Sequence, residues 1–301
     1  MLESILSLTF LAQGLRISIP YILPALGGTF SERSGVVNIA LEGMLLVGGF
    51  ATAAGTYFTD NPFIGILCGI AAGMVLSVIH GLASVTFKVD QIITGIALNL
   101  LAVGGTKFTS QWIFHSSSNS PRIAGVERMD IPFLNEYPLI NLLLKPFVLL
   151  TIVLIVAANF VLFKTRFGLR LRAVGEHPEA ADSLGISVAR MRFSGVLISG
   201  LCSGLGGAWL ALDQHSFTDG MSAGRGFIAL AAIIVGKWKP LAATVACIVF
   251  GFAEALALQL QSGNIPTQFI QMIPYVLTMI ALAGFIGRSS PPASDGIPYE
   301  K

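Results

Sequence analysis

Charged residues are scarce in this chain of 301 residues, because Asp, Glu, Lys and Arg together make up only 11% of it. Soluble domains carry about 25%. Hydrophobic residues reach 54%, and the mean hydropathy is +0.78. The net charge is only +2, without the continuous basic face that a nucleic-acid footprint needs. The composition therefore indicates an integral membrane protein and gives no support for a nucleic-acid partner.

Cysteine and catalytic motifs are also sparse. The three cysteines, Cys68, Cys202 and Cys247, lie in apolar runs without disulfide or metal spacing. The sequence contains no G-x-x-x-x-G-K-[S/T] loop, which is the usual phosphate-binding loop for nucleotides. It also shows no paired-carboxylate, zinc or nucleophile motif. We therefore expect no enzyme activity, metal or cofactor on this chain, and any ATP must be hydrolysed by a partner.

What the chain does contain is a series of long apolar stretches. A membrane span needs about 20 mostly apolar residues. Nine stretches approach that length: residues 4–29, 35–58, 62–87, 91–114, 139–163, 193–213, 217–236, 239–260 and 268–287. The sequence therefore predicts an all-α integral membrane protein with about nine transmembrane helices.

The seventh stretch is the shortest, since only Gly226 to Gly236 is free of charge. That length reaches barely half the membrane, which is typical of a half-helix lining a pathway. The alternative is an ordinary short span extended by Ser216 to Arg225.

A polar island between Lys164 and Arg192 interrupts the apolar stretches. Its six basic residues are Lys164, Arg166, Arg170, Arg172, Arg190 and Arg192. Basic residues beside membrane ends mark the cytoplasmic side, so the island is expected inside and Met1 outside. Within the island, Pro178 and Glu179 suit a helix start and Gly185 suits its end. A short exposed helix, Pro178 to Leu184, is predicted.

Glycines recur at four-residue intervals within the apolar stretches. Gly65, Gly69 and Gly73 form one such row, and Gly200 and Gly204 form another. Small residues at this spacing let helix backbones approach closely in lipid. We interpret both rows as packing faces.

Four charged residues inside the predicted spans need an explanation: Arg16, Glu42, Lys107 and Glu254. Such a charge costs about 2.5–3.5 kcal/mol at a helix centre and normally faces the bundle or a wet cavity. Asn38 lies four residues before Glu42, which predicts one shared helical face near the cavity mouth. The alternative is that Glu42 pairs with Arg16 or reaches the interface.

Three motifs carry a family resemblance. RFGLRLRAVGEHPEAADSLGI, from Arg166 to Ile186, resembles the cytoplasmic coupling segment of ABC importer permeases in the branched-chain amino acid and ribose group. SERSGVVNIALEGMLLVGGF, from Ser31 to Phe50, is similar to an early signature of the nucleoside and simple-sugar permeases. GRGFIALAAIIVGKWKP, from Gly224 to Pro240, is the third match. The motifs stand in the family's order and spacing.

The resemblance implies one permease domain over residues 1–290, with a cytoplasmic coupling segment at 164–192 and a cytoplasmic tail at 291–301. It implies a bacterial cell membrane location. It also implies a second, longer permease subunit, two ATPase subunits that bind ATP and Mg²⁺, and an extracytoplasmic substrate-binding lipoprotein. The residues implied in coupling are Gly175, Glu176, His177, Pro178, Glu179, Ala180, Ala181, Asp182 and Gly185.

The expected function is nucleoside import by alternating access. Aromatic and amide side chains suit a nucleoside, since base faces stack on rings and base edges accept and donate hydrogen bonds. The candidate pathway residues are Asn38, Glu42, Asn99, Phe108, Trp112, Trp209 and Glu254. Each polar one has an interhelical hydrogen bond as its alternative role. Ribose, other simple sugars and branched-chain amino acids are the competing substrates, and an ion-coupled secondary transporter or a passive channel is the competing class.

Overall fold

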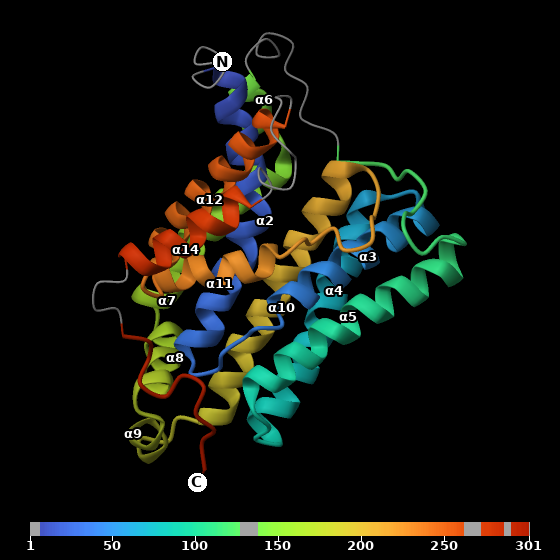
Figure 1. Ribbon diagram of the computed structural model, residues 1–301. Coiled ribbons are helices and arrows are strands. Elements are labelled where there is room, and N and C mark those ends of the chain that lie inside the picture. Colours follow the sequence, from blue (N-terminus) through green and yellow to red (C-terminus); the bar gives the residue numbers. More distant parts are fainter. Residues whose placement is uncertain (1–6, 127–137, 262–271, 286–289, 301) are drawn as a thin grey trace.

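The computed structural model describes residues 7–126, 138–261, 272–285 and 290–300, and within them the protein is almost entirely helical (Figure 1). One isolated antiparallel bridge joins Asn119 to Thr218. The longer helices are α2 (Leu8–Arg33), α3 (Leu41–Thr59), α4 (Pro62–Gly81), α5 (Gln91–Phe114), α7 (Pro146–Lys164), α10 (Val188–Gln214) and α12 (Pro240–Leu260). The shorter elements are the π-helical turn η1 (Leu82–Thr86), α6 (Pro138–Leu143), α8 (Arg166–Glu176), α9 (Pro178–Ser183), α11 (Arg225–Val235) and α14 (Ile273–Phe285).

Five of the described helices are long and apolar enough to cross a membrane: α4 with η1, α5, α7, α10 and α12. The all-α membrane fold is thus confirmed, whereas the total of nine spans stays a prediction. The fifth stretch, predicted as one helix over 139–163, is two helices, because the chain breaks at Lys145 and restarts with Pro146 at the first position of α7. The ninth, 268–287, lies partly outside the described residues.

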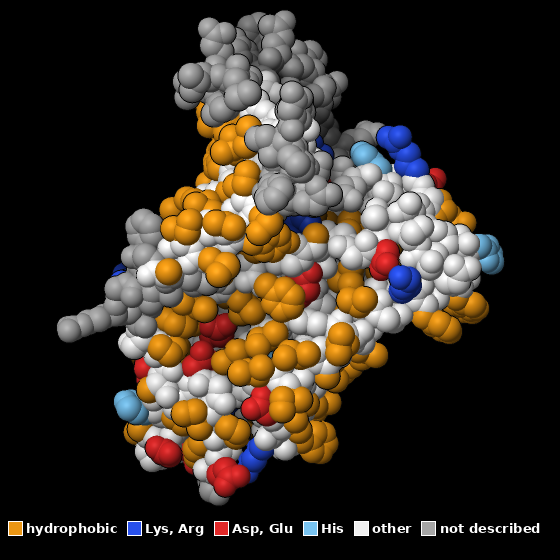
Figure 2. Space-filling model, in the orientation of Figure 1, with side chains coloured by type: hydrophobic (Ala, Val, Ile, Leu, Met, Phe, Trp, Pro, Cys, Tyr) orange, Lys and Arg blue, Asp and Glu red, His pale blue; other side chains and the backbone are white. Residues whose placement is uncertain are grey.

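Helix α10 is the centre of the bundle. In the most apolar 18-residue stretch of α10, 83% is buried inside the protein, whereas the corresponding share is 28% for α5 and 22% for α7. It packs against α2, α3 and α4, and α2 also packs against α12. Hydrophobic side chains cover broad areas of the outer face seen in Figure 2. The outer helices therefore present apolar side chains outward, as lipid contact requires.

The contact between α4 and α10 depends on the two predicted glycine rows. A Cβ atom added to Gly73 would lie 2.4 Å from the Gly200 carbonyl oxygen, and one added to Gly204 would lie 2.5 Å from the Gly69 carbonyl oxygen. Gly65 faces α3 instead, 2.0 Å from the Thr56 hydroxyl by the same measure. The prediction of packing faces is confirmed, since side chains at these positions would force the backbones apart.

Helix α11 has only 11 residues and spans about 16 Å, so the half-helix alternative for the seventh stretch is the correct one. Its N-terminus lies against α3. There Glu42 accepts hydrogen bonds from the backbone N–H groups of Gly224, at 2.8 Å, and Gly226, at 2.7 Å. A carboxylate at this place satisfies two amides that have no partner within the helix and complements the helix dipole.

The two ends of the bundle differ. The short helix α9 and the C-terminus lie at one end, and the start of α2 and helix α6 lie at the other (Figure 1). The predicted helix Pro178 to Leu184 is confirmed as α9, one residue shorter. Since the charge distribution predicts the polar island inside, the α9 end is the expected cytoplasmic end.

Adding one methyl group to the α4–α10 contact should destabilise the protein. Gly204→Ala places its Cβ against backbone atoms of α4, and overpacking of this kind costs about 1–3 kcal/mol. The matched control is Gly104→Ala on α5, where a Cβ has no atom within 4 Å. Thermal unfolding in detergent should show a lower midpoint for Gly204→Ala only. Equal midpoints would contradict the close contact.

Neutralising Glu42 should weaken the attachment of α11. Glu42→Gln keeps the shape, but its single oxygen accepts only one of the two hydrogen bonds and its NH2 group faces the other backbone N–H as a second donor. Hydrogen bonds to charged groups contribute about 1.5–3 kcal/mol. We expect a lower unfolding midpoint than for Glu179→Gln, which alters an exposed carboxylate of α9. A Glu42→Gln variant as stable as the control would show that the cap contributes little.

Candidate functional site

A cavity lies between α2, α10, α11 and α12, in the half of the bundle away from α9. Its volume is about 230 Å³. The lining residues are Gln13, Arg16, Ile17, Pro20, Trp209, Leu210, Asp213, Gln214, Arg225, Glu254 and Leu258. A second cavity of about 320 Å³ shares Glu254 and Leu258 with it and adds Tyr21, Gln261 and Tyr275. The two cavities together combine aromatic rings with charged and amide groups.

Glu254 of α12 lines both cavities. This carboxylate forms an ion pair with Arg225, 2.6 Å from Nη2, and accepts a hydrogen bond from the Tyr21 hydroxyl. Arg225 is the first residue of α11 and also donates to the Met221 carbonyl at 2.9 Å. The first residue of α11, Arg225, therefore lies at the cavity and neutralises Glu254, the single acidic residue of α12.

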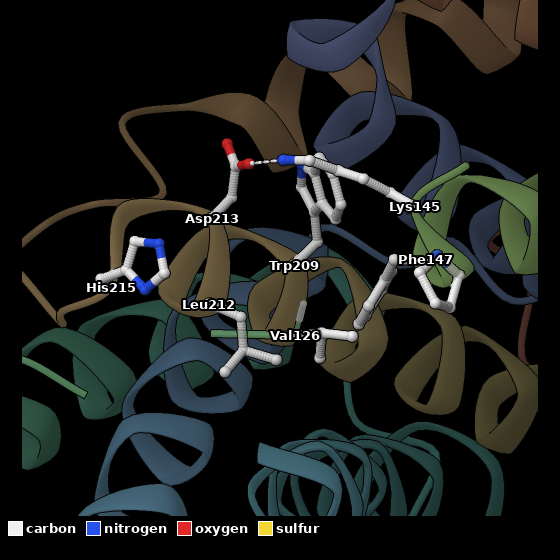
Figure 3. A pocket seen from close by; sticks show the side chains of 8 residues that line it. Val126, Lys145, Phe147, Trp209, Leu212, Asp213 and His215 are labelled. Carbon is white, nitrogen blue, oxygen red and sulfur yellow. Dashed lines mark hydrogen bonds and ion pairs between the residues drawn. The ribbon is translucent and has the colours of Figure 1, made fainter. Parts of the chain in front are cut away.

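A second charged group lies at the end of the cavity away from α9. Asp213 of α10 pairs with Arg16, Oδ2 to Nε, at 2.7 Å and with Lys145, Oδ1 to Nζ, at 3.1 Å. Lys145 Nζ lies 5.3 Å from the centre of the Trp209 ring. Figure 3 shows Lys145 extended beside that ring toward Asp213, with Phe147 close by. The Trp209 ring is thus fixed in position, because a cation and a second aromatic ring flank it.

Two of the sequence-predicted pathway residues, Trp209 and Glu254, line these cavities. Three others, Asn38, Glu42 and Asn99, lie around the start of α3. Asn38 is fully buried and donates to the Ser199 hydroxyl at 2.5 Å. Asn99 accepts from the Gly43 amide at 2.8 Å and donates to the Ile39 carbonyl at 3.0 Å. These side chains satisfy backbone and hydroxyl groups between helices.

The predicted shared helical face of Asn38 and Glu42 is wrong. Helix α3 begins at Leu41, so Asn38 lies in the non-helical segment before it, where its side-chain oxygen Oδ1 accepts from the Ala40 amide at 3.1 Å. Glu42 does not pair with Arg16 either, because Arg16 pairs with Asp213 and Glu42 caps α11. The error arose because the segment between α2 and α3 is not helical. Residues four apart share a face only inside a helix.

Phe108 and Trp112 lie on the outer face of α5, with 77% and 76% of their surface exposed, and neither lines the two cavities. Lys107 beside them pairs with Asp219 at 3.3 Å. Sequence reasoning missed Arg225, Asp213, Tyr21 and Tyr275 as cavity residues. A charge directly before the apolar half-helix was the available signal for Arg225.

The predicted coupling residues form the turn from α8 into α9. Gly175 and Pro178 are buried, Glu176 pairs with Arg33 at 3.6 Å, and Ala181 is buried toward the bundle. The exposed residues of this segment are His177, Glu179, Ala180, Ser183, Leu184 and Gly185. Asp182 is half-buried. The segment thus has an inner face that packs on the bundle and an outer face that is open.

Comparison with known proteins agrees with the motifs. Residues 10–282 match the family described as branched-chain amino acid transport system / permease component. The guanosine ABC transporter permease protein NupQ of Bacillus subtilis is 43% identical over 300 residues, covering 94% of this chain and 93% of that protein. The nucleoside ABC transporter permease protein NupC of Lactococcus lactis is 40% identical over 301 residues, covering 94% of each.

A solved ABC transporter in an inward-facing conformation has a similar fold. The TM-score is 0.52 at 17% sequence identity, and the match covers 92% of this chain and 85% of that one. At this identity the likeness concerns the fold alone. The family match extends over most of the chain, and the two relatives align with this chain over nearly their whole length. The chain therefore belongs to the branched-chain amino acid transport permease family and is a permease of the ABC transporter class.

Proposed function

We propose that this permease carries nucleosides inward across the membrane, with ATP hydrolysed on separate subunits. The main support is the identity of 40–43% over nearly the full length to permeases named for guanosine and nucleosides. The partners would be ATPase subunits, an extracytoplasmic binding lipoprotein and a second permease subunit. ATP and Mg²⁺ would be bound by the ATPase subunits, which agrees with the absence of a phosphate-binding loop in this sequence.

The chemistry of the cavities supports a nucleoside as the substrate. A base needs an aromatic face for stacking and polar groups for its edges, and the ribose needs hydrogen-bond partners. Trp209, Tyr21 and Tyr275 supply aromatic surface, and Gln13 and Gln261 supply amides. Leucine has no flat aromatic face to stack on these rings, although its ammonium and carboxylate groups would find partners in the charged lining. Binding assays with the companion lipoprotein against nucleosides, pentoses and leucine separate the three substrate classes.

The outer face of α9 supports the coupling role. It carries a small residue, Ala180, beside the acidic Glu179 and the 80%-exposed Leu184. Such a face suits a groove in a soluble protein, because it presents one apolar anchor among polar groups. Movement of the ATPase subunits would shift α9 and, through α8 and α10, the helices around the cavity.

Removing the Trp209 ring should weaken transport. Stacking of a base on an aromatic ring contributes about 1–3 kcal/mol, so Trp209→Ala should lower guanosine uptake by roughly 5- to 150-fold in proteoliposomes containing the assembled complex. Trp112→Ala removes the same side chain from the exposed face of α5; because Trp209 is only 4% exposed, the uptake of both variants is compared per amount of assembled complex. Equal uptake by the two variants would remove Trp209 from the pathway.

Altering the outer face of α9 should uncouple the complex. Charge reversal in Glu179→Lys combined with the bulky Ala180→Trp should abolish substrate-stimulated ATP hydrolysis while leaving the permease pair assembled. The control is Phe58→Trp, a bulky replacement at an exposed site at the end of α3 away from α9. Full stimulated hydrolysis in the double variant would refute the coupling role.

A further inference from the structure

The C-terminal residues 290–300 fold back onto the bundle beside α8 (Figure 1). The backbone N–H of Ser294 donates to the Gly175 carbonyl at 2.9 Å, and that of Ala293 donates to a Glu176 carboxylate oxygen at 3.2 Å. The Ser294 hydroxyl donates to the Glu176 carbonyl at 3.4 Å. This segment, which we call the tail, therefore binds the last two residues of α8, directly before the coupling helix α9.

The tail is also bound to the central helix α10 through Arg192. This side chain is 2% exposed, and its Nη1 donates to the Ile297 carbonyl at 2.8 Å and its Nη2 to the Ser294 carbonyl at 3.5 Å. A buried guanidinium that loses its acceptors is strongly unfavourable. Burial, together with the nearby Glu32 carboxylate, also raises the pKa of the tail residue Asp295 above the usual range of a carboxyl group. The tail is thus an integral part of this end of the protein.

A small apolar cluster joins the tail to three helices. Tyr299 packs against buried Val174 of α8, Ala181 of α9 and Val188 of α10. The exposed ion pair between Lys88 and Glu300, at 3.3 Å, adds little stability because water screens it. The cluster lies apart from the larger cores of the bundle. Tyr299 is the one member of this cluster that comes from the tail, so removing the tail takes away a side chain that packs over the inner face of α9.

The end of α8 is enclosed on both sides. A Cβ atom at Gly175 would lie 2.2 Å from the Arg33 carbonyl oxygen at the end of α2, so the two backbones are in close contact there. The tail also contacts this end of α8, through the hydrogen bond from Ser294 to the Gly175 carbonyl. Helix α2 and α10 both line the cavity of about 230 Å³. The end of α8 is therefore joined to α2 directly and to α10 through the tail, and both of these helices reach the cavity.

We propose that the tail is a strap that makes α8 and α9 move as one body with the cytoplasmic ends of α2 and α10. The proposal rests on the coupling role proposed above for α9. The exposed residues Glu179, Ala180 and Leu184 remain uncovered by the tail, so the strap leaves the outer face of α9 free for the ATPase. Arg192 is a positioning residue, because it acts on coupling through the tail.

The first test measures coupling in the reconstituted complex. In complexes that size-exclusion chromatography shows to be assembled, deletion of residues 290–301 should leave basal ATP hydrolysis intact but lower guanosine uptake per ATP hydrolysed at least fivefold. A synthetic peptide of residues 290–301 added to the deleted complex should restore part of the uptake. Tyr299→Ala, which keeps the Arg192 bonds, is the milder variant and should give an intermediate ratio. Lys88→Ala breaks only the exposed ion pair and should behave as wild type.

The second test measures position. Spin labels at exposed Ser183 of α9 and Phe87 after η1, with the three cysteines replaced by alanine, should give one narrow distance distribution in the full-length complex. Tyr299→Ala and the tail deletion should broaden it. Unchanged distances and unchanged uptake per ATP in both variants would overturn the strap, while coupled uptake by the full-length complex would leave the proposed function standing. Absence of nucleoside-stimulated hydrolysis in the full-length complex would instead count against the function itself.

Discussion

The hydrogen bonds that Glu42 accepts from Gly224 and Gly226 hold the rest of the site together. A helix that starts inside a membrane protein leaves backbone amides without partners, and lipid cannot supply any. Glu42 supplies them from α3 and fixes the N-terminus of α11. Arg225 is thereby placed at the cavity, where it pairs with Glu254 of α12. One carboxylate thus fixes where α11 begins and brings Arg225 to the cavity.

Close helix packing gives this arrangement its rigidity. Helix α10 contacts α3 and α4 through glycines, so its backbone lies within van der Waals distance of theirs. The same helix carries Trp209 and Asp213 at the cavity and Arg192 at the tail. Because packed helices move as units, a displacement at the α9 end of α10 reaches the cavity as a shift of the whole helix. Helix α10 therefore connects the cavity with the end of the bundle that carries the proposed coupling segment.

Much of the fold could be predicted from the sequence. Apolar length identified the helices, four-residue spacing identified the glycine faces, and Pro178 with Gly185 bounded α9. The candidate site was harder to predict. The four-residue spacing of Asn38 and Glu42 predicts a shared face only if the helix extends through Asn38, and the chain is not helical there. The two side chains therefore bind different partners. Phe108 and Trp112 had the right chemistry for a base, but only the tertiary structure shows that they face outward. Long-range pairs such as Arg16 with Asp213 have no local signal.

The central claim is that an external ATPase moves a nucleoside through this bundle. The most direct measurement is guanosine uptake into proteoliposomes that contain the full complex and its binding lipoprotein, with ATP present or absent on the ATPase side and no ion gradient. The account predicts uptake that requires ATP and is competed by other nucleosides but not by ribose or leucine. Uptake that continues without ATP and follows an imposed ion gradient would contradict it.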